Sequence, residues 1–213
     1  CYPMPKLRFS ETDLLRTPDS FVPFLKTEIE QSLPHRFQQQ ARHRPDKTAI
    51  KTATESLTYS DLNRVANQIA HAVLTAAGKG NKPVALLIER DALIIAAILG
   101  VLKAGKIYVP LDPADSPSRN NNILLESQAR LLLTDNSTYS QVGRLWSADV
   151  PFVNLDELDP ATSVDDPDLN VPPDPFAKTN DFLKFEAYKK VKYKIKMFTF
   201  AGVPFTLDEK TEN

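Results

Sequence analysis

The chain has very little cysteine, and it lacks a long uninterrupted apolar segment. Only one of its 213 residues, Cys1, is a cysteine, which excludes an internal disulfide and a zinc site built from several cysteines. The longest apolar run, Ala92 to Leu102, is too short to span a bilayer, and no signal peptide is recognisable. We therefore expect a cytoplasmic chain without a membrane partner. A first residue other than methionine indicates a piece of something longer.

An excess of charge of one sign is also missing. The formal net charge is −1, which argues against a dedicated nucleic-acid binder. The charge is unevenly distributed, because residues 1–177 hold 18 basic and 22 acidic residues, whereas residues 178–213 hold 8 basic and 5 acidic ones. A hydrophobic content of 42% and a charged content of 25% are typical of a globular protein.

The stretch from Leu99 to Pro113, LGVLKAGKIYVPLDP, organises the rest of the chain. An apolar helix ends at Gly105, a residue suited to the left-handed turn after a helix. The strand Ile107 to Val109 follows at once and is predicted to stop at Pro110. A helix, a glycine and a strand with almost no loop are typical of a βαβ unit.

The pattern on both sides repeats this unit. Apolar runs at 83–88, 130–134 and 151–154 predict further strands, and two short strands are predicted at 48–53 and 57–59. Helices are predicted at 35–44, from a cap at Ser60 to Gly78, and at 92–102, 117–127 and 136–146. Right-handed crossovers then give an α/β fold whose mostly parallel sheet carries helices on both faces.

Several apparent motifs are better explained without function. The segment from Gly100 to Ile107 nearly matches a phosphate loop, but it lacks the hydroxyl residue and runs from helix to strand. His35 and His43 have no acidic partner at metal-ligand spacing. The Asp-rich stretch after residue 156 lacks the glycine of a calcium loop. Asn136-Ser137-Thr138 matches a glycosylation sequon without a secretory signal.

Two motifs carry a resemblance to a known family. LKAGKIYVPLDP resembles the second core motif of the adenylation domains of nonribosomal peptide synthetases, which are adenylate-forming, AMP-binding enzymes, and Leu57 to Leu62 resembles their first. The resemblance covers residues 34 to 176 and implies the first α/β subdomain of the large N-terminal lobe. It assigns architectural roles to the motif residues Leu57, Thr58, Tyr59, Leu62, Leu102, Lys103, Ala104, Gly105, Tyr108, Pro110, Leu111 and Asp112. Lys103 is expected to be a solvated cation at a helix end.

The same resemblance implies the chemistry of the intact enzyme. That enzyme would use ATP and magnesium to convert a carboxylate to an acyl-adenylate and pyrophosphate. It would then pass the acyl group to the phosphopantetheine thiol of a carrier domain, beside a condensation domain. After Phe176 the family carries a Ser/Thr/Gly-rich phosphate loop, yet no glycine occurs here before Gly202. We therefore predict no catalytic, cofactor-binding or metal-binding residue and no activity for the chain alone.

Four segments are predicted on this basis. They are a linker at 1–33, a partial adenylation domain at 34–158, an Asp/Pro-rich exposed linker at 159–177, and a basic tail unrelated to the family at 178–213. In the tail, lysines alternate with apolar residues from Lys190 to Met197. This pattern fits an edge strand or polyanion-binding surface, or foreign sequence introduced by a reading-frame error.

Two other functions stay open from the sequence. The chain could be a non-catalytic α/β fragment or docking module, which the missing phosphate loop favours. It could also be a separate nucleotide-binding domain, although no G-x-G-x-x-G motif follows a strand.

Overall fold

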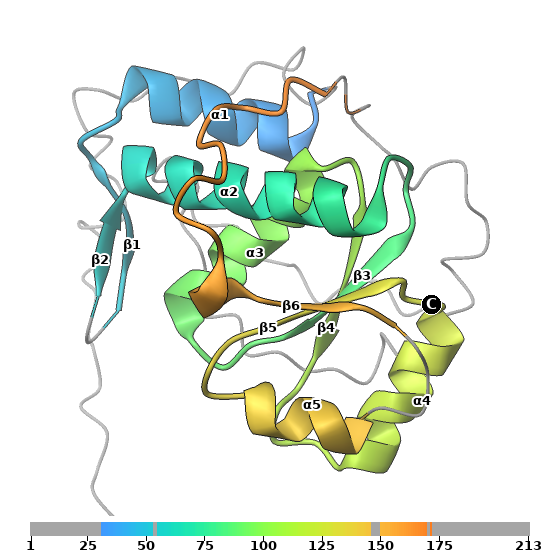
Figure 1. The fold of residues 1–213 in the computed structure, drawn as a ribbon. Helices are drawn as coiled ribbons and strands as arrows, with labels where there is room; N and C mark the ends of the chain where they lie inside the picture. The colour runs from blue at the N-terminus through green and yellow to red at the C-terminus, as the bar shows by residue number, and fades with distance from the viewer. Residues whose placement is uncertain (1–30, 53–54, 146–149, 170, 172–213) are drawn as a thin grey trace, which may run out of the picture. The chain divides into compact units, whose positions relative to one another are not determined.

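A parallel four-stranded sheet forms the centre of the fold in the computed structural model (Figure 1). The structure describes residues 31–52, 55–145, 150–169 and 171. The sheet has the order β4-β3-β5-β6, and each pair of neighbouring strands is parallel. Its strands are β3 (Pro83–Leu87), β4 (Ile107–Leu111), β5 (Leu131–Thr134) and β6 (Phe152–Asn154).

The two central strands are apolar because both of their faces are covered. Residues 84–87 of β3 and 131–134 of β5 are all buried. The register places Val84 opposite Tyr108 on one side and opposite Leu131 on the other. Strands covered on both faces read as continuous apolar runs, which is the pattern from which they were predicted.

Helices join the strands and cover the sheet in two layers (Figure 1). The layer above the sheet contains α1 (Leu33–His43), α2 (Tyr59–Ala77) and α3 (Asp91–Lys103); the layer below contains α4 (Pro117–Ser127) and α5 (Tyr139–Leu145). Each layer has its own apolar core, one around Ile69, Val84 and Leu133, and one around Leu87, Leu132 and Val142. The predicted α/β fold with helices on both faces is confirmed.

A small antiparallel hairpin and the first helix complete the upper layer. Strands β1 (Thr48–Lys51) and β2 (Ser56–Thr58) pair with each other and lie beside α2. In α1, Phe37 and Ala41 are buried. No helix among the described residues is long and apolar enough to cross a membrane.

Two sequence predictions about local structure are wrong. β4 continues through Pro110 to Leu111 instead of ending at Val109, because β4 is an edge strand and proline is tolerated where one side of a strand has no partner. The cap of α2 is Thr58 and not Ser60, and Thr58 forms a capping box with Asp61. The predicted linker up to residue 30 and the predicted tail at 178–213 lie outside the described residues.

The turn from α3 into β4 has the geometry expected from its glycine. Gly105 has a φ of 68°, and its N–H donates to the Leu102 carbonyl at 3.0 Å. The next N–H, of Lys106, donates to the Val101 carbonyl at 3.1 Å. These two bonds are a Schellman motif, which satisfies carbonyls at the end of α3 and starts β4 without a loop.

Helices α2 and α3 lie in close contact at Gly100. A Cβ on Gly100 would lie 2.7 Å from Cβ of Ile69 and 2.9 Å from the carbonyl oxygen of Ala66. One of these neighbours is backbone, so the clash cannot be relieved by rotating a side chain. Gly143 in α5 is a matched contrast, since a Cβ there would meet nothing within 4 Å.

We expect Gly100→Ala to lower the free energy of unfolding by about 1–2 kcal/mol, because overpacking outweighs the better helix propensity of alanine. Gly143→Ala should raise it by about 0.5–1 kcal/mol, since only the propensity changes. Urea unfolding followed by far-UV circular dichroism measures both. Equal effects of the two substitutions would contradict the close helix contact.

Candidate functional site

The residues of the first motif lie around the start of α2. Leu57 lies in β2, Tyr59 begins α2, and Leu62 is buried in the upper core. The Asp61 N–H donates to the Thr58 hydroxyl at 3.1 Å, and that hydroxyl in turn donates to the Asp61 carboxylate at 2.7 Å. Hydrogen bonds from the Thr58 side chain and backbone lower the pKa of Asp61. These contacts are local and position the helix.

The residues of the second motif form the α3–β4 unit. Leu102, Ala104 and Leu111 are buried, whereas Tyr108 and Pro110 are half-buried. Asp112 follows β4, and its carboxylate accepts from the Ala114 N–H at 2.8 Å. The expectation for Lys103 is wrong: its side chain is only 3% exposed and pairs with Asp166.

The two motifs lie on different elements, but residues of both belong to the same upper apolar core: Leu57, Tyr59 and Leu62 of the first, and Ala104 and Tyr108 of the second. The first packs at the beginning of α2, and the second connects α3 to the edge of the sheet. Among the motif residues, Leu57 alone lines the groove between the hairpin, α2 and α3. Their architectural role remains a prediction.

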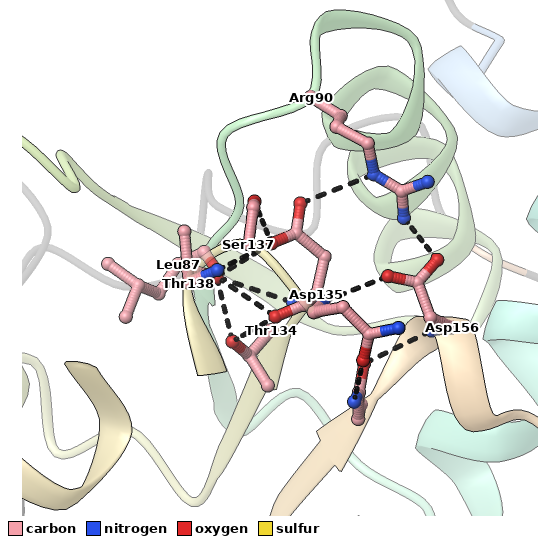
Figure 2. Close-up of polar contacts among 9 residues, drawn as sticks. Leu87, Arg90, Thr134, Asp135, Ser137, Thr138 and Asp156 are labelled. Carbon is pink, nitrogen blue, oxygen red and sulfur yellow. Dashed lines mark hydrogen bonds and ion pairs between the residues drawn. The ribbon is translucent and has the colours of Figure 1, made fainter. Parts of the chain in front are cut away.

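The polar residues with the best geometry for a site lie elsewhere, at the carboxyl ends of the strands. The strand order reverses between β3 and β5, since β4 lies on one side of β3 and the later strands lie on the other. In open α/β sheets, ligands bind at such a switch point. Here Arg90 follows β3, Asp135 follows β5, and Asp156 follows β6 (Figure 2).

Arg90 joins these three connections through its guanidinium. Its Nε lies 3.5 Å from Oδ2 of Asp135, and its Nη2 pairs with Oδ1 of Asp156 (Figure 2). Asp156 also accepts from the Asn136 N–H at 2.8 Å. Asn154 donates from Nδ2 to the Asn136 side-chain oxygen at 2.7 Å. One arginine thus holds together the chain after three of the four strands.

Asp135 is the buried centre of this cluster. Its side chain is 0% exposed, and its Oδ1 accepts from the Ser137 hydroxyl and, at 3.0 Å, from the Thr138 N–H. Burial acts to raise the pKa of Asp135, but the hydrogen bonds from Ser137 and Thr138 outweigh it and lower the pKa below its ordinary value. Asp135 is therefore a carboxylate held in its charged form.

Thr138 ties the cluster to the central strand. Its hydroxyl donates to the Leu87 carbonyl at 2.7 Å, at the end of β3. The Thr134 hydroxyl lies 2.8 Å from the Thr138 hydroxyl oxygen. That Thr138 oxygen also accepts from the Asp135 N–H at 3.3 Å. Every hydrogen-bonding position of the Thr138 hydroxyl is used, so it is not available to a ligand.

An open groove borders the cluster on the side of α2 and α3. Its volume is about 390 Å³. Apolar residues of the hairpin and the two helices form most of the lining, with Arg90, Glu55 and Ser56 as the polar residues; the apolar ones are Leu57, Val65, Ala92, Leu93 and Ala96. Arg90 is the residue that the groove and the cluster share.

The polar cluster of Arg90, Asp135 and Asp156 has the chemistry of a structural connection between loops and not of a reaction centre. The three histidines lie in α1 and α2, so Ser137 and Thr138 have no imidazole base beside them. The described residues contain no group of three or more His, Cys, Asp or Glu that could hold a metal ion. One arginine against two aspartates leaves the cluster net negative, which does not fit a triphosphate.

Sequence reasoning missed this cluster, although a signal for it was present. Arg90, Asp135 and Asp156 each come within three residues of the end of an apolar strand. Parallel strands bring such residues to one edge. Asn136-Ser137-Thr138 was interpreted only as a glycosylation sequon. In the structure, Ser137 and Thr138 belong to a turn that hydrogen-bonds to the Asp135 carboxylate.

The fold and the two motifs point to one family of proteins, and comparison with known proteins shows which family it is. Residues 37–206 match the family described as AMP-binding enzyme, so the chain belongs to that family. The matched range extends beyond Phe176, where the motif resemblance ends, into residues outside the described part of the chain.

The relatives within that family are nonribosomal peptide synthetases. A linear gramicidin synthase of Brevibacillus parabrevis is 44% identical over 102 residues, which are 48% of this chain and 2% of that protein. Bacitracin synthase 3 of Bacillus licheniformis is 40% identical over 113 residues, 53% of this chain and 2% of that protein. This chain therefore spans a small part of the curated relatives that it matches.

Solved structures agree with this assignment. The nonribosomal peptide synthetase FmoA3, in a form bound to alpha-methyl-L-serine-AMP, has 26% identity and a TM-score of 0.60, covering 64% of this chain and 15% of that one. IdnL7 has 32% identity and a TM-score of 0.54, covering 61% and 26%. The chain thus belongs to the AMP-binding enzyme family, and the relatives and solved structures that it resembles over part of their length are adenylate-forming proteins of that family.

Replacing the buried Asp135 carboxylate tests whether the polar cluster stabilises the fold. We expect Asp135→Asn to lower the free energy of unfolding by about 2 kcal/mol at neutral pH, because hydrogen bonds to a charged acceptor are lost. A depressed folded-state pKa stabilises the fold above the unfolded pKa of about 3.9, and this contribution is lost as the pH falls through the folded-state pKa. The difference in the free energy of unfolding between the unsubstituted chain and Asp135→Asn should therefore become smaller in acid. Urea unfolding at a series of pH values measures this difference.

Asp115→Asn is the matched control for this substitution. Asp115, which lies just before α4, pairs with Arg119 in the first turn of that helix at 3.1 Å, and the two side chains are 26% and 47% exposed. We expect a change of at most about 0.5 kcal/mol. An effect of Asp135→Asn as small as this, or one that grows in acid, would contradict the role given to Asp135.

Proposed function

We propose that this chain is part of an enzyme that activates an amino acid for nonribosomal peptide synthesis. In the complete reaction, a carboxylate oxygen of the substrate attacks the α-phosphorus of ATP and pyrophosphate leaves. The thiol of a carrier-bound phosphopantetheine then attacks the acyl carbon, and AMP leaves. The observation that carries this proposal is the family match over residues 37–206, together with relatives that are synthetases.

The described residues would contribute the scaffold of that enzyme. The polar cluster at the switch point is internally paired and net negative, so the groups that bind ATP and magnesium are expected outside the described residues. Arg90, Asp135 and Asp156 would keep the carboxyl edge of the sheet in one arrangement. The twelve motif residues would fix the α2 and α3–β4 units against each other.

The working partners follow from the same assignment. They would be the remainder of the adenylation domain and the condensation and carrier domains of a synthetase in the cytoplasm, with no nucleic acid or membrane involved. We expect the 213-residue chain alone to be inactive. The alternative of a docking module without an enzymatic parent gains no support, because the similar proteins are synthetases.

A chimera tests whether these residues still serve as an adenylation scaffold. Residues 34–158 would replace the equivalent segment of an active adenylation domain from linear gramicidin synthase. We expect amino-acid-dependent exchange of pyrophosphate into ATP within about tenfold of the parent rate, because the substituted part supplies the scaffold and not the reacting groups. The unmodified 213-residue chain should show no exchange.

Two results would count against the proposal. A soluble chimera with a native circular dichroism spectrum but no exchange would show that the segment no longer supports catalysis. Exchange by the chain alone would overturn its predicted inactivity. The same chimera with Leu132→Asp, which places a charge in the sheet core, is the inactive control.

A further inference from the structure

The Asp/Pro-rich segment after β6 has a defined path over residues 155–169, where the short 3-10 helix Leu155–Glu157 is its one regular element (Figure 1). We call residues 162–169 the strap. Side chains of the segment hold its own backbone: Asp159 accepts from the Ala161 N–H at 2.8 Å, Ser163 from Asp165 at 3.2 Å, and Asp166 from Asp168 at 2.9 Å. The strap is thus pre-shaped by local turns.

Polar side chains of α2 attach the strap to the upper helix layer. Asn67 donates from Nδ2 to the Val164 carbonyl at 2.7 Å, and the His71 ring nitrogen lies 3.0 Å from the Asp165 carbonyl. Val164 itself is 43% exposed, so it adds little apolar burial. The strap is therefore held mainly by polar contacts.

The strongest of these contacts comes from α3. The Lys103 side chain is 3% exposed, and its ammonium donates to the Asp166 carboxylate. Burial lowers the pKa of Lys103, and Asp166 acts in the opposite direction. Among the described carboxylates, Asp166 is the one that pairs with this lysine. With the strap in place but without the Asp166 carboxylate, the lysine would be a desolvated charge with no counter-ion.

The path of the strap runs from one corner of the sheet to the opposite one. The segment leaves β6 at the carboxyl edge and passes Asn67 and His71 of α2 before reaching Lys103 at the end of α3. Val171 then lies beside Gly105, with its Cγ2 3.9 Å from where a Cβ would sit. Gly105 precedes β4, which is the other edge strand.

We propose that the Lys103–Asp166 pair is a latch that closes the strap over α2 and α3 as a separate two-state unit, and that this latch holds Val171 beside Gly105, just before β4. In the closed state the ammonium and carboxylate are paired, and residue 171 is fixed beside Gly105. In the open state Lys103 is exposed to water and Val171 is released from Gly105. The inference does not depend on the proposed enzymatic activity.

Hydrogen exchange of the full 213-residue chain, followed by mass spectrometry, tests the latch. In Lys103→Met, which fills the same space without a charge, peptides covering the strap should exchange about tenfold or more faster, while α2 and α3 keep their protection. Asp166→Asn should open the strap at least as much, because it leaves the buried ammonium unpaired. Lys79→Met, at an exposed lysine, is the control and should change neither region.

The double variant separates a latch from two independent contacts. Lys103→Met with Asp166→Asn should open the strap no further than Lys103→Met alone, because the same pair is already broken. Unchanged strap exchange in both single variants would overturn the proposal. A rise that occurs equally in α3 would also overturn it, since the strap would then open only with the whole fold. Asp166 lies on the outer strap, so its variant stays informative if Lys103→Met fails to fold.

Discussion

The need to cover both faces of a parallel sheet governs this structure. Parallel strands require a crossover between each pair, and here α3, α4 and α5 provide them. Once α3 lies above the sheet and α4 and α5 lie below, every strand in the series ends at the same edge. The polar cluster of Arg90, Asp135 and Asp156 exists because three loops meet there and their charged groups must be paired.

Sequence reasoning succeeded where one element alone determines the pattern. The apolar runs of β3 and β5 and the turn at Gly105 depend on burial and backbone geometry, which are readable locally. It failed where the outcome depends on a distant partner. Lys103 reads as a solvated helix-end cation until a segment more than 60 residues later supplies Asp166. Pro110 reads as a stop until the edge position of β4 is known.

The candidate site shows the same division. The motifs identified the family by the similarity of their sequences. They did not indicate that Arg90 and Asp135 would meet, because that contact depends on the strand order. Thr58 and Ser60 were both acceptable caps by residue type, and the hairpin geometry selected Thr58. The cluster supports a scaffold role, since its buried carboxylate is fully hydrogen-bonded and its arginine is neutralised.

The order in which the chain assembles follows from the route of the strap. Its binding surface on α2 and α3 is complete only after the sheet has formed and β6 has taken its place at the edge. Because these contacts join residues far apart in the sequence, we expect the strap to close late in folding. Interactions made late change the unfolding rate far more than the folding rate. On this expectation, the Lys103–Asp166 pair slows unfolding and leaves the folding rate nearly unchanged.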